Sequence, residues 1–304
     1  MQRTAPENGP AHLVTRKTGF VELFRTTPPE TVCPNFFVLR HANGCAFAPK
    51  CDYCFLKSSF WYLKADRVYA NTARLLSDVG AWLRRDGLPS FVLNAGNLSD
   101  SLCFEPQRPL VRDLVALFRD AARDGSRQHT LLLVTKGGVE LCSPLLEIEP
   151  CAGVVVSFSL NHPEAARRLE RGAAPAESRL DAMRLLARQG WRVRARLDPM
   201  VQGFDYGALA DAVRESRAER VTLGSLRAEP NLLRYVDREL FGPLEAPEGG
   251  GGLWRYPRPV RRALYRQAIL GLNGSCSLGL CEETEAVWRE LGLDPTSPSC
   301  NCAL

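Results

Sequence analysis

Residues 44–56 read Gly-Cys-Ala-Phe-Ala-Pro-Lys-Cys-Asp-Tyr-Cys-Phe-Leu, so that Cys45, Cys51 and Cys54 stand in one short segment. An apolar run at residues 36–39 comes just before this segment and predicts a first β-strand. Three protein thiolates are fewer than the four ligands of a closed structural zinc site. They suit a four-iron cluster in which one iron is left open for a substrate.

The composition allows one large domain or two small ones. The chain has 304 residues, of which 45% are hydrophobic, and an (α/β) barrel of ordinary size would use nearly all of it. The net charge of +5 is mild, whereas a face that binds nucleic acid normally carries a basic stripe. Arginines occur only in short runs, such as residues 167–168 and 261–262. A nucleic-acid partner is therefore not expected.

The cysteine count points to a reducing compartment. The chain has eleven cysteines, and residues 1–10 hold no apolar segment like that of a secretory signal. No stretch is long and apolar enough to span a membrane. In such a chain thiols serve metals or catalysis rather than disulfides. We expect a cytoplasmic protein without a membrane partner.

Strand-like and helix-like segments alternate after the cysteine segment. Continuous apolar runs predict buried strands, and apolar residues at helical spacing predict the helices between them. Six strands that alternate with helices imply a parallel sheet with right-handed crossovers. The fold class is therefore α/β, with a partial or complete (β/α) barrel. The expected strands are residues 36–39, 90–94, 129–135, 153–159, 191–197 and 220–224, and the expected helices are residues 75–85, 108–119, 178–189 and 208–217.

Three regions are expected along the chain. Residues 1–34 form an N-terminal extension, residues 35–245 the barrel, and residues 246–304 a Cys-rich segment that caps it. Residues 249–252 are all glycine and predict a flexible break. A helix is expected at residues 258–272 beyond it.

Polar side chains follow five of the six predicted strands. Function collects at the C-terminal ends of strands in barrel folds, and such a rim can hold a carboxylate, an ammonium group and ribose hydroxyls together. The five strand ends are residues 95–101, 135–138, 157–161, 194–200 and 224–227.

The order of these motifs resembles the spore photoproduct lyase branch of the radical SAM superfamily. The resemblance runs from about residue 36 to residue 227 and also includes Arg179 at the start of a helix. The resemblance implies that the expected barrel is of the radical SAM type. The motifs are Gly96-x-x-Ser99-Asp100-Ser101, Thr135-Lys136, Ser157-Phe-Ser-Leu-Asn161, Arg194-x-Arg196-x-Asp198-Pro199 and Gly224-x-x-Arg227.

The resemblance implies two cofactors, a [4Fe-4S] cluster and S-adenosylmethionine (SAM), and an external reductant such as flavodoxin or ferredoxin. The expected enzyme cleaves SAM reductively in order to modify a small substrate. The implied cluster ligands are Cys45, Cys51 and Cys54. The implied SAM-binding residues are Tyr53 near the adenine, Gly96, Asn97 and Ser99 near the methionyl ammonium, Lys136 at the carboxylate, and Ser157, Ser159 and Asn161 as hydrogen-bonding groups. Arg196 and Asp198 are the candidate catalytic residues, with a structural ion pair as their alternative interpretation.

The sequence departs from this family in two places. Five residues separate Cys45 from Cys51, where the usual spacing is three. Asn97 stands where the lyases carry a hydrogen-donating cysteine, and the nearest thiol, Cys103, is six residues further on. Without that donor a thymine-dimer repair cycle would lose its quenching step. Repair of DNA photoproducts is therefore the alternative function within the same chemistry.

A cysteine-rich tail offers a more specific function. Its thiols could be small buried side chains, a second metal centre, or a pocket for a thiophilic substrate, because soft ligands select soft centres. A lyase-like branch that acts in arsinothricin biosynthesis transfers a 3-amino-3-carboxypropyl group from SAM to trivalent arsenic, and this reaction is our leading specific hypothesis. The tail cysteines are Cys276, Cys281, Cys300 and Cys302.

A zinc site is the alternative interpretation of the cysteine segment. Cys33 or His41 would then complete the ligand set. This alternative predicts a colourless, non-catalytic binding protein that unfolds when the metal is chelated.

Overall fold

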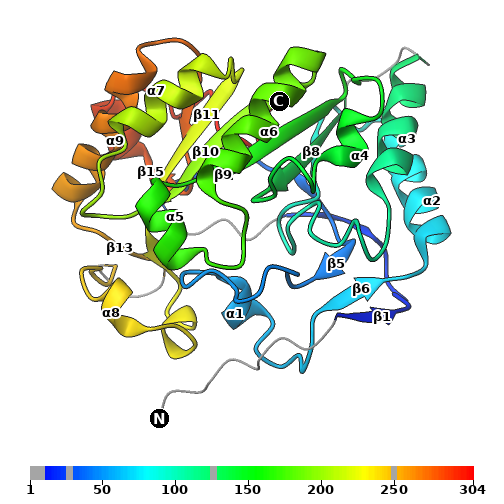
Figure 1. Ribbon diagram of the computed structural model, residues 1–304, viewed down its shortest axis with the longest axis horizontal. Coiled ribbons are helices and arrows are strands. Elements are labelled where there is room, and N and C mark those ends of the chain that lie inside the picture. The colour runs from blue at the N-terminus through cyan, green and yellow to red at the C-terminus, as the bar shows by residue number, and fades with distance from the viewer. Residues whose placement is uncertain (1–10, 25–29, 124–128, 248–251) are drawn as a thin grey trace.

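One eight-stranded sheet organises the chain (Figure 1). The computed structural model describes residues 11–24, 30–123, 129–247 and 252–304. The strand order is β14-β11-β10-β9-β8-β7-β4-β2, with all neighbours parallel except the antiparallel pair β2–β4. The strands are β2 (Val21–Leu23), β4 (Phe37–Leu39), β7 (Val92–Asn94), β8 (Thr130–Thr135), β9 (Val154–Leu160), β10 (Arg192–Met200), β11 (Arg220–Ser225) and β14 (Ser277–Leu280).

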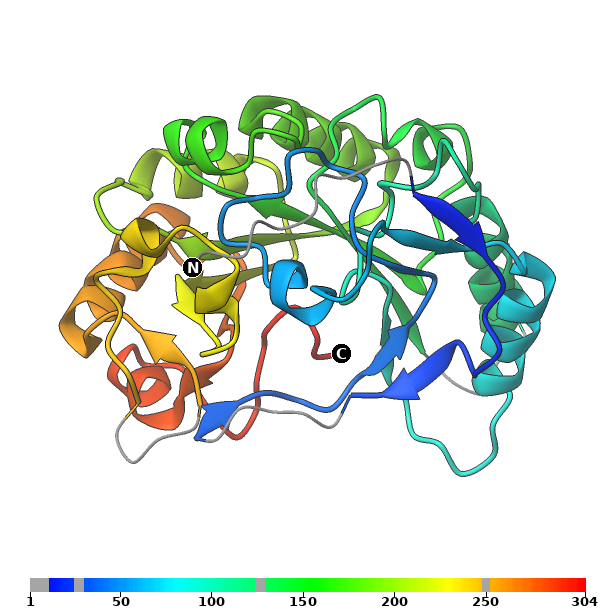
Figure 2. The same cartoon turned by 90° about the horizontal axis from the view of Figure 1, so that it is seen from below.

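Helices cover the outer side of this sheet. Figure 2 shows the sheet as an arch, with the long helices along its convex side and the C-terminus inside the arch. The outer helices are α2 (Thr72–Leu83), α3 (Val111–Arg123), α4 (Ser143–Leu146), α5 (Pro163–Leu169), α6 (Ala176–Gln189), α7 (Gly207–Glu215) and α9 (Arg258–Leu272).

Short elements complete the fold around the ends of the arch. Helix α1 lies at the open side of the arch in Figure 2. These elements are α1 (Leu56–Ser59), α8 (Arg238–Phe241), α10 (Glu285–Glu290), the 3-10 helix η1 (Leu232–Arg234), and the strands β1 (His12–Val14), β3 (Thr31–Val32), β5 (Ala42–Asn43), β6 (Arg67–Tyr69), β12 (Arg227–Ala228), β13 (Trp254–Arg255) and β15 (Glu283–Thr284).

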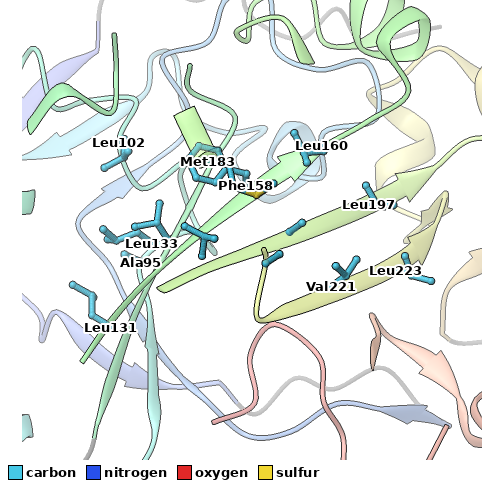
Figure 3. Packing of buried hydrophobic residues seen from close by; sticks show 14 of the residues in the cluster. Ala95, Leu102, Leu131, Leu133, Phe158, Leu160, Met183, Leu197, Val221 and Leu223 are labelled. Carbon is cyan, nitrogen blue, oxygen red and sulfur yellow. The ribbon is translucent and has the colours of Figure 1, made fainter. Parts of the chain in front are cut away.

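Alternation along each strand divides the sheet into an apolar and a polar face. Successive side chains point to opposite faces, and one set packs against the helices as the main core (Figure 3). Full burial of one such aliphatic side chain contributes roughly 1.5–3 kcal/mol. The core side of the central strands holds Leu131, Leu133, Val156, Phe158, Leu160, Ala195, Leu197, Val221 and Leu223.

The inner side of the arch becomes polar toward the strand ends. In β9 it begins with Val155 and continues with Ser157 and Ser159, which are buried. Arg194 and Arg196 of β10 stand beside these two serines in the sheet register. The apolar face therefore builds the core, and the polar face is available for a site.

The predicted α/β partial barrel is confirmed. All six predicted strands are present, and Gly190 ends α6 in the left-handed conformation with φ of 98°. Within the described residues the sheet ends at β2 and β14, so it is an open arch and not a closed barrel.

Two edge strands come from segments expected outside the barrel. Strand β2 lies in the expected N-terminal extension and pairs with β4. Strand β14 lies in the Cys-rich segment and extends the parallel sheet beside β11. Residues 1–10, and the predicted glycine break apart from Gly252, lie outside the described residues. Among the described residues, no helix combines the length and the apolar character needed to cross a membrane.

Candidate active site

The cysteine loop follows β5 and ends in α1. The amide of Gly44 donates to Leu98 O (3.0 Å), which ties the loop to the turn after β7. Cys45 and Cys51 are buried and Cys54 is half-buried. Gly172 allows the backbone after α5 to approach the cysteine loop closely, because a Cβ at this position would lie 2.4 Å from Pro49 O. The loop is thus packed against the turn after β7 and against the segment after α5.

Burial governs the ionisation of these three thiols. Burial raises the pKa of Cys54 to about 11. It also raises the pKa of Cys51, and the positive charge of Lys136 partly offsets that rise. A hydrogen bond with Cys103, and then burial, raise the pKa of Cys45. The thiols are therefore protonated at neutral pH in the metal-free chain, and metal binding must displace their protons.

Cys103 is a fourth thiol at the loop. Its Sγ accepts a hydrogen bond from the Ala46 amide (3.4 Å) and lies 3.6 Å from Ser99 Oγ. The side chain is buried in the same small cluster as Cys45. The sequence left its direction open, and the fold turns it toward the cysteine loop.

The turn after β7 is held to the end of β8 by Asp100. One carboxylate oxygen accepts hydrogen bonds from the Cys103 amide (3.0 Å) and Thr135 Oγ1 (3.0 Å), and the other accepts from the Lys136 amide (2.7 Å). Ser99 Oγ is directed to Asp100 O and to the Cys103 thiol. Asp100 therefore joins the turn, including Cys103, to Thr135 and Lys136 at the end of β8. The predicted SAM-binding residues Gly96, Asn97 and Ser99 are part of this turn.

Three predicted SAM-binding residues meet at one carboxylate that the sequence did not indicate, Glu170. Lys136 Nζ lies 3.0 Å from Glu170 Oε1 and 3.3 Å from the Tyr53 hydroxyl. The Tyr53 hydroxyl donates to the same carboxylate oxygen, and Asn161 Nδ2 reaches it at 3.4 Å. Arg179 pairs with the other oxygen. We call these five residues the Glu170 group.

Glu170 is ionised in this setting. Burial alone would raise its pKa, but Lys136 and Arg179 lower it to about 2. Glu170 follows α5, away from the strand ends on which the sequence argument relied. The burial of Arg179, which calls for a carboxylate partner, is known only from the fold, so no sequence signal indicated Glu170.

Ser157 has an unused hydroxyl on the inner face. The residue is fully buried, and within the described part of the chain its Oγ has no hydrogen-bond partner. The same holds for Thr222 Oγ1 on β11. A buried hydroxyl without a partner is costly, so both positions fit an incoming polar group.

Arg196 and Asp198 form a buried ion-pair network. Asp198 pairs with Arg196 and with Arg227, whose Nη1 lies 2.7 Å from Asp198 Oδ1. Arg227 Nε also lies 2.7 Å from Glu282 Oε2. Burial would raise the pKa of Asp198, but Arg227 and Arg196 hold it well below its usual range. Asp198 is thus a fixed anion in this structure, and its predicted catalytic role remains a prediction.

Three of the four tail cysteines enter the arch, and Cys33 joins them. Arg227 Nη2 donates to Cys281 Sγ (3.2 Å), and Asn94 Nδ2 lies 3.7 Å from Cys302 Sγ. Cys33 and Cys302 pack against the same inner apolar cluster. Burial and then Cys300 raise the pKa of Cys33, to about 12. We call Cys33, Cys281, Cys300 and Cys302 the inner thiol group.

Cys276 does not belong to this group. It is half-buried and packs against the main core on the helix side. Burial raises the pKa of its thiol. Across residues 11–24, 30–123, 129–247 and 252–304, no three His, Cys, Asp or Glu side chains are grouped to hold a single metal ion.

Solved structures share this fold. No protein-family model matches the chain, and no curated protein matches it in sequence. Spore photoproduct lyase complexed with dinucleoside spore photoproduct is similar at a TM-score of 0.66 and 16% identity, over 88% of this chain and 82% of that chain. A lyase mutant with bound AdoMet and dinucleoside spore photoproduct matches at a TM-score of 0.62 and 16% identity, over 84% and 77%.

A more distant neighbour is Streptococcus suis SuiB bound to precursor peptide SuiA. It matches at a TM-score of 0.51 and 11% identity, over 84% of this chain and 52% of that chain. At these identities the likeness concerns the fold. The chain thus shares the α/β partial-barrel fold of spore photoproduct lyase.

Proposed function

We propose that this chain is a radical SAM enzyme that holds a [4Fe-4S] cluster at Cys45, Cys51 and Cys54 and binds SAM beside it. One observation carries the proposal: the cysteine loop adjoins the Glu170 group at the polar ends of the strands. Tyr53, which lies in the loop between Cys51 and Cys54, donates to Glu170 and lies 3.3 Å from Lys136 Nζ, so the loop and the group are in direct contact.

The donor set of the loop fits a cluster better than one zinc ion. Zinc needs its ligands around a single point, and the described residues hold no such group of three. In a four-iron cluster each thiolate binds a different iron. The bound cluster and SAM would supply reductive C–S bond cleavage, and the protein would orient SAM and exclude water.

The Glu170 group fits the amino-acid end of SAM. Lys136 is a compact charge on a flexible stem, suited to a carboxylate, and its side chain is 16% exposed while Glu170 is fully enclosed. Glu170 keeps Arg179 as a partner when Lys136 turns toward a ligand. The turn that contains Gly96 and the unused Ser157 hydroxyl offer further hydrogen bonds.

Anaerobic reconstitution with iron and sulfide, followed by dithionite and SAM, tests this proposal. We expect a brown protein that cleaves SAM, and mass spectrometry identifies the product. Cys51→Ala should lose cluster absorbance and SAM cleavage together, whereas the control Cys276→Ala should keep both. A colourless protein that is indifferent to SAM would overturn the proposal in favour of the zinc alternative.

Lys136→Ala tests the SAM site separately. It should weaken SAM binding, measured by titration calorimetry, and leave the cluster absorbance unchanged. Loss of the absorbance as well would give Lys136 a structural role.

The proposed reaction is transfer of the 3-amino-3-carboxypropyl group from SAM to trivalent arsenic. The inner thiol group supports it, since one buried and three half-buried thiols on the inner side of the arch make a soft donor set for a thiophilic substrate. Among the described residues no three of these thiols already surround a single point, so binding of arsenic would have to draw them together. Group transfer does not need a cysteine in place of Asn97. Methylthioadenosine would be the second product.

Cys300→Ala combined with Cys302→Ala tests the thiophilic substrate. The double variant should cleave SAM normally but lose turnover with arsenite, and Cys276→Ala should lose neither. Unchanged turnover with arsenite would show that the inner thiol group does not bind the substrate.

Repair of a DNA photoproduct is the second candidate function. One observation favours it: the Cys103 thiol lies beside Ser99 in the turn where the lyases carry their hydrogen donor. This candidate requires 5′-deoxyadenosine as the SAM product, and Cys103→Ala would then stop repair of a photoproduct dinucleotide. Methylthioadenosine as the product would contradict it.

A further inference from the structure

The cysteine loop and helix α1 border a pocket. The cavity has a volume of about 400 Å³, and residues 48–50, Asp52, α1, residues 63–66 and Arg171 line it. Residues on both sides of Cys51 are part of its wall. We call this cavity the loop pocket. It lies outside the Glu170 group and the inner thiol group.

The loop pocket is cationic. Lys50, Lys57, Lys64 and Arg171 line it, against the two carboxylates Asp52 and Asp66. Lys50 Nζ pairs with Asp66 at 2.7 Å, and Arg171 lies 3.6 Å from Asp52. Within the described residues, Lys57 and Lys64 pair with no carboxylate. Two positive charges are thus left to attract an anionic partner.

Exposed aromatic side chains lie at the same pocket and beside it: Trp61 is part of its wall, and Phe55 and Tyr62 are neighbours of wall residues along the chain. Phe55, Trp61 and Tyr62 are 47%, 49% and 58% exposed. Trp61 stacks on Tyr235 with ring centroids 6.3 Å apart, and it meets Tyr62 edge-on at 6.1 Å. Large exposed apolar side chains that lie together mark an interaction surface, and aromatic residues are enriched in protein–protein interfaces.

We propose that the loop pocket and its aromatic surround dock an acidic protein that carries one electron to the cluster. This inference rests on the proposed function. The carrier is oxidised by one electron and the cluster is reduced by one, and no atom is transferred. Because residues next to Cys51 form the wall of the pocket, a carrier seated there stands beside the cluster ligands. The unpaired lysines supply charge complementarity, which speeds encounter and fixes orientation.

Reversal of the two unpaired lysine charges tests the docking surface. Lys57→Glu with Lys64→Glu should weaken binding of oxidised flavodoxin, an acidic protein, by about tenfold or more in titration calorimetry. The control is Arg188→Glu with Arg266→Glu, which makes the same change in net charge at exposed positions of α6 and α9. The control should bind flavodoxin like the unaltered protein. Flavodoxin binding should also weaken steeply with salt.

Rate measurements separate this inference from the proposed function. With dithionite, which needs no docking, the lysine double variant should cleave SAM at the unaltered rate, and with reduced flavodoxin its rate should fall about tenfold. If the unaltered protein fails to cleave SAM with dithionite, the proposed function fails first. If both proteins respond equally to reduced flavodoxin, the docking surface is wrong.

Two further outcomes are decisive. If the double variant loses its cluster absorbance, Tyr62→Ser provides the measurement, because this exposed ring lies on the same surface and outside the cysteine loop. A Tyr62→Ser protein that binds flavodoxin normally would overturn the proposal. Loss of single-stranded oligonucleotide binding in the lysine variant, with flavodoxin binding unchanged, would make this surface a nucleic-acid platform instead.

Discussion

At the scale of single residues, Glu170 controls the electrostatics of the candidate SAM site. It accepts hydrogen bonds or ion pairs from Tyr53, Lys136, Asn161 and Arg179 while it is itself buried. Two cations surround one anion, so the group as a whole carries a positive charge. Such a site suits the carboxylate of an amino acid, and removal of the anion leaves two cations without a partner.

Glu170→Gln should therefore lower the free energy of unfolding by about 3–5 kcal/mol near pH 7, the usual effect of breaking a buried ion pair. The pKa of Glu170 falls from 4.5 to about 2 on folding. The stabilisation is thus present above pH 4.5 and is lost as the pH falls toward 2. Urea unfolding at pH 7 and pH 3 measures both effects.

Glu164→Gln is the matched control. Glu164 lies on α5 with a half-exposed side chain, 3.7 Å from Arg168. Its loss should cost less than about 1 kcal/mol. The proposed electrostatics would be contradicted if the two variants lost the same free energy of unfolding at pH 7. They would also be contradicted if the loss in Glu170→Gln were as large at pH 3 as at pH 7.

At the scale of elements, the end of α6 depends on one glycine. Gly190 has φ of 98°, and its amide closes the last turn onto Leu186 O and Ala187 O. An added Cβ would meet only Pro150, at 3.8 Å, so the cost of Gly190→Ala is conformational. We expect about 1–2 kcal/mol lower stability in urea unfolding. At Gly153 the nearest atom would lie 3.6 Å away and φ is ordinary, so Gly153→Ala should change stability little.

The C-terminal tail is held inside the arch by two arginines. Arg220 donates to Cys300 O (3.0 Å), Ala303 O (2.8 Å) and Leu304 O (2.7 Å). Arg194 donates to Asn301 O (2.7 Å) and Ala303 O (3.0 Å). Hydrogen bonds to a charged group contribute about 1.5–3 kcal/mol. The tail position therefore depends on side chains of β10 and β11.

Arg220→Met should loosen the tail and raise the alkylation rate of Cys302 by roughly tenfold or more, since each 1.4 kcal/mol is a factor of ten. Peptide mass spectrometry after timed labelling measures the rate, with Cys276 in the same sample as the internal reference. Arg192→Met is the control, because Arg192 pairs with Glu219 and, within the described part of the chain, makes no hydrogen bond to the tail. If Cys302 is alkylated as slowly in Arg220→Met as in the unaltered protein, Arg220 does not hold the tail in place.

At the scale of the whole molecule, charge bears on the DNA-repair alternative. The chain has 39 Lys and Arg against 34 Asp and Glu, and many arginines are already paired with carboxylates. We expect binding to duplex DNA weaker than about 10⁻⁴ M at physiological salt. Fluorescence anisotropy with a labelled duplex measures it. Tight binding that weakens steeply with salt would revive DNA repair as the leading function.

The sequence by itself determined the parallel α/β core and the polar strand ends that form its rim, whereas the openness of the arch and its edge strands β2 and β14 emerged only from the fold. Apolar runs and helical spacing are local properties of the sequence, and they set where a buried strand or helix begins and ends. The six strands and the end of α6 were therefore predicted correctly. The strand pattern also placed Lys136 and Asn161 at the same rim, because the ends of parallel strands share one edge of a sheet. Tyr53 was expected near the adenine of SAM, and its contact with Lys136 emerged only from the fold.

Only the tertiary structure decided which side chains meet across long separations. Glu170 joins Tyr53 from 117 residues away, and neither local pattern nor charge indicated that partner. Cys33 joins Cys300 and Cys302, while Cys276 packs on the other side of the sheet. A strand exposes alternate residues to opposite faces, so the fold, and not the count of cysteines, selects which thiols share a space.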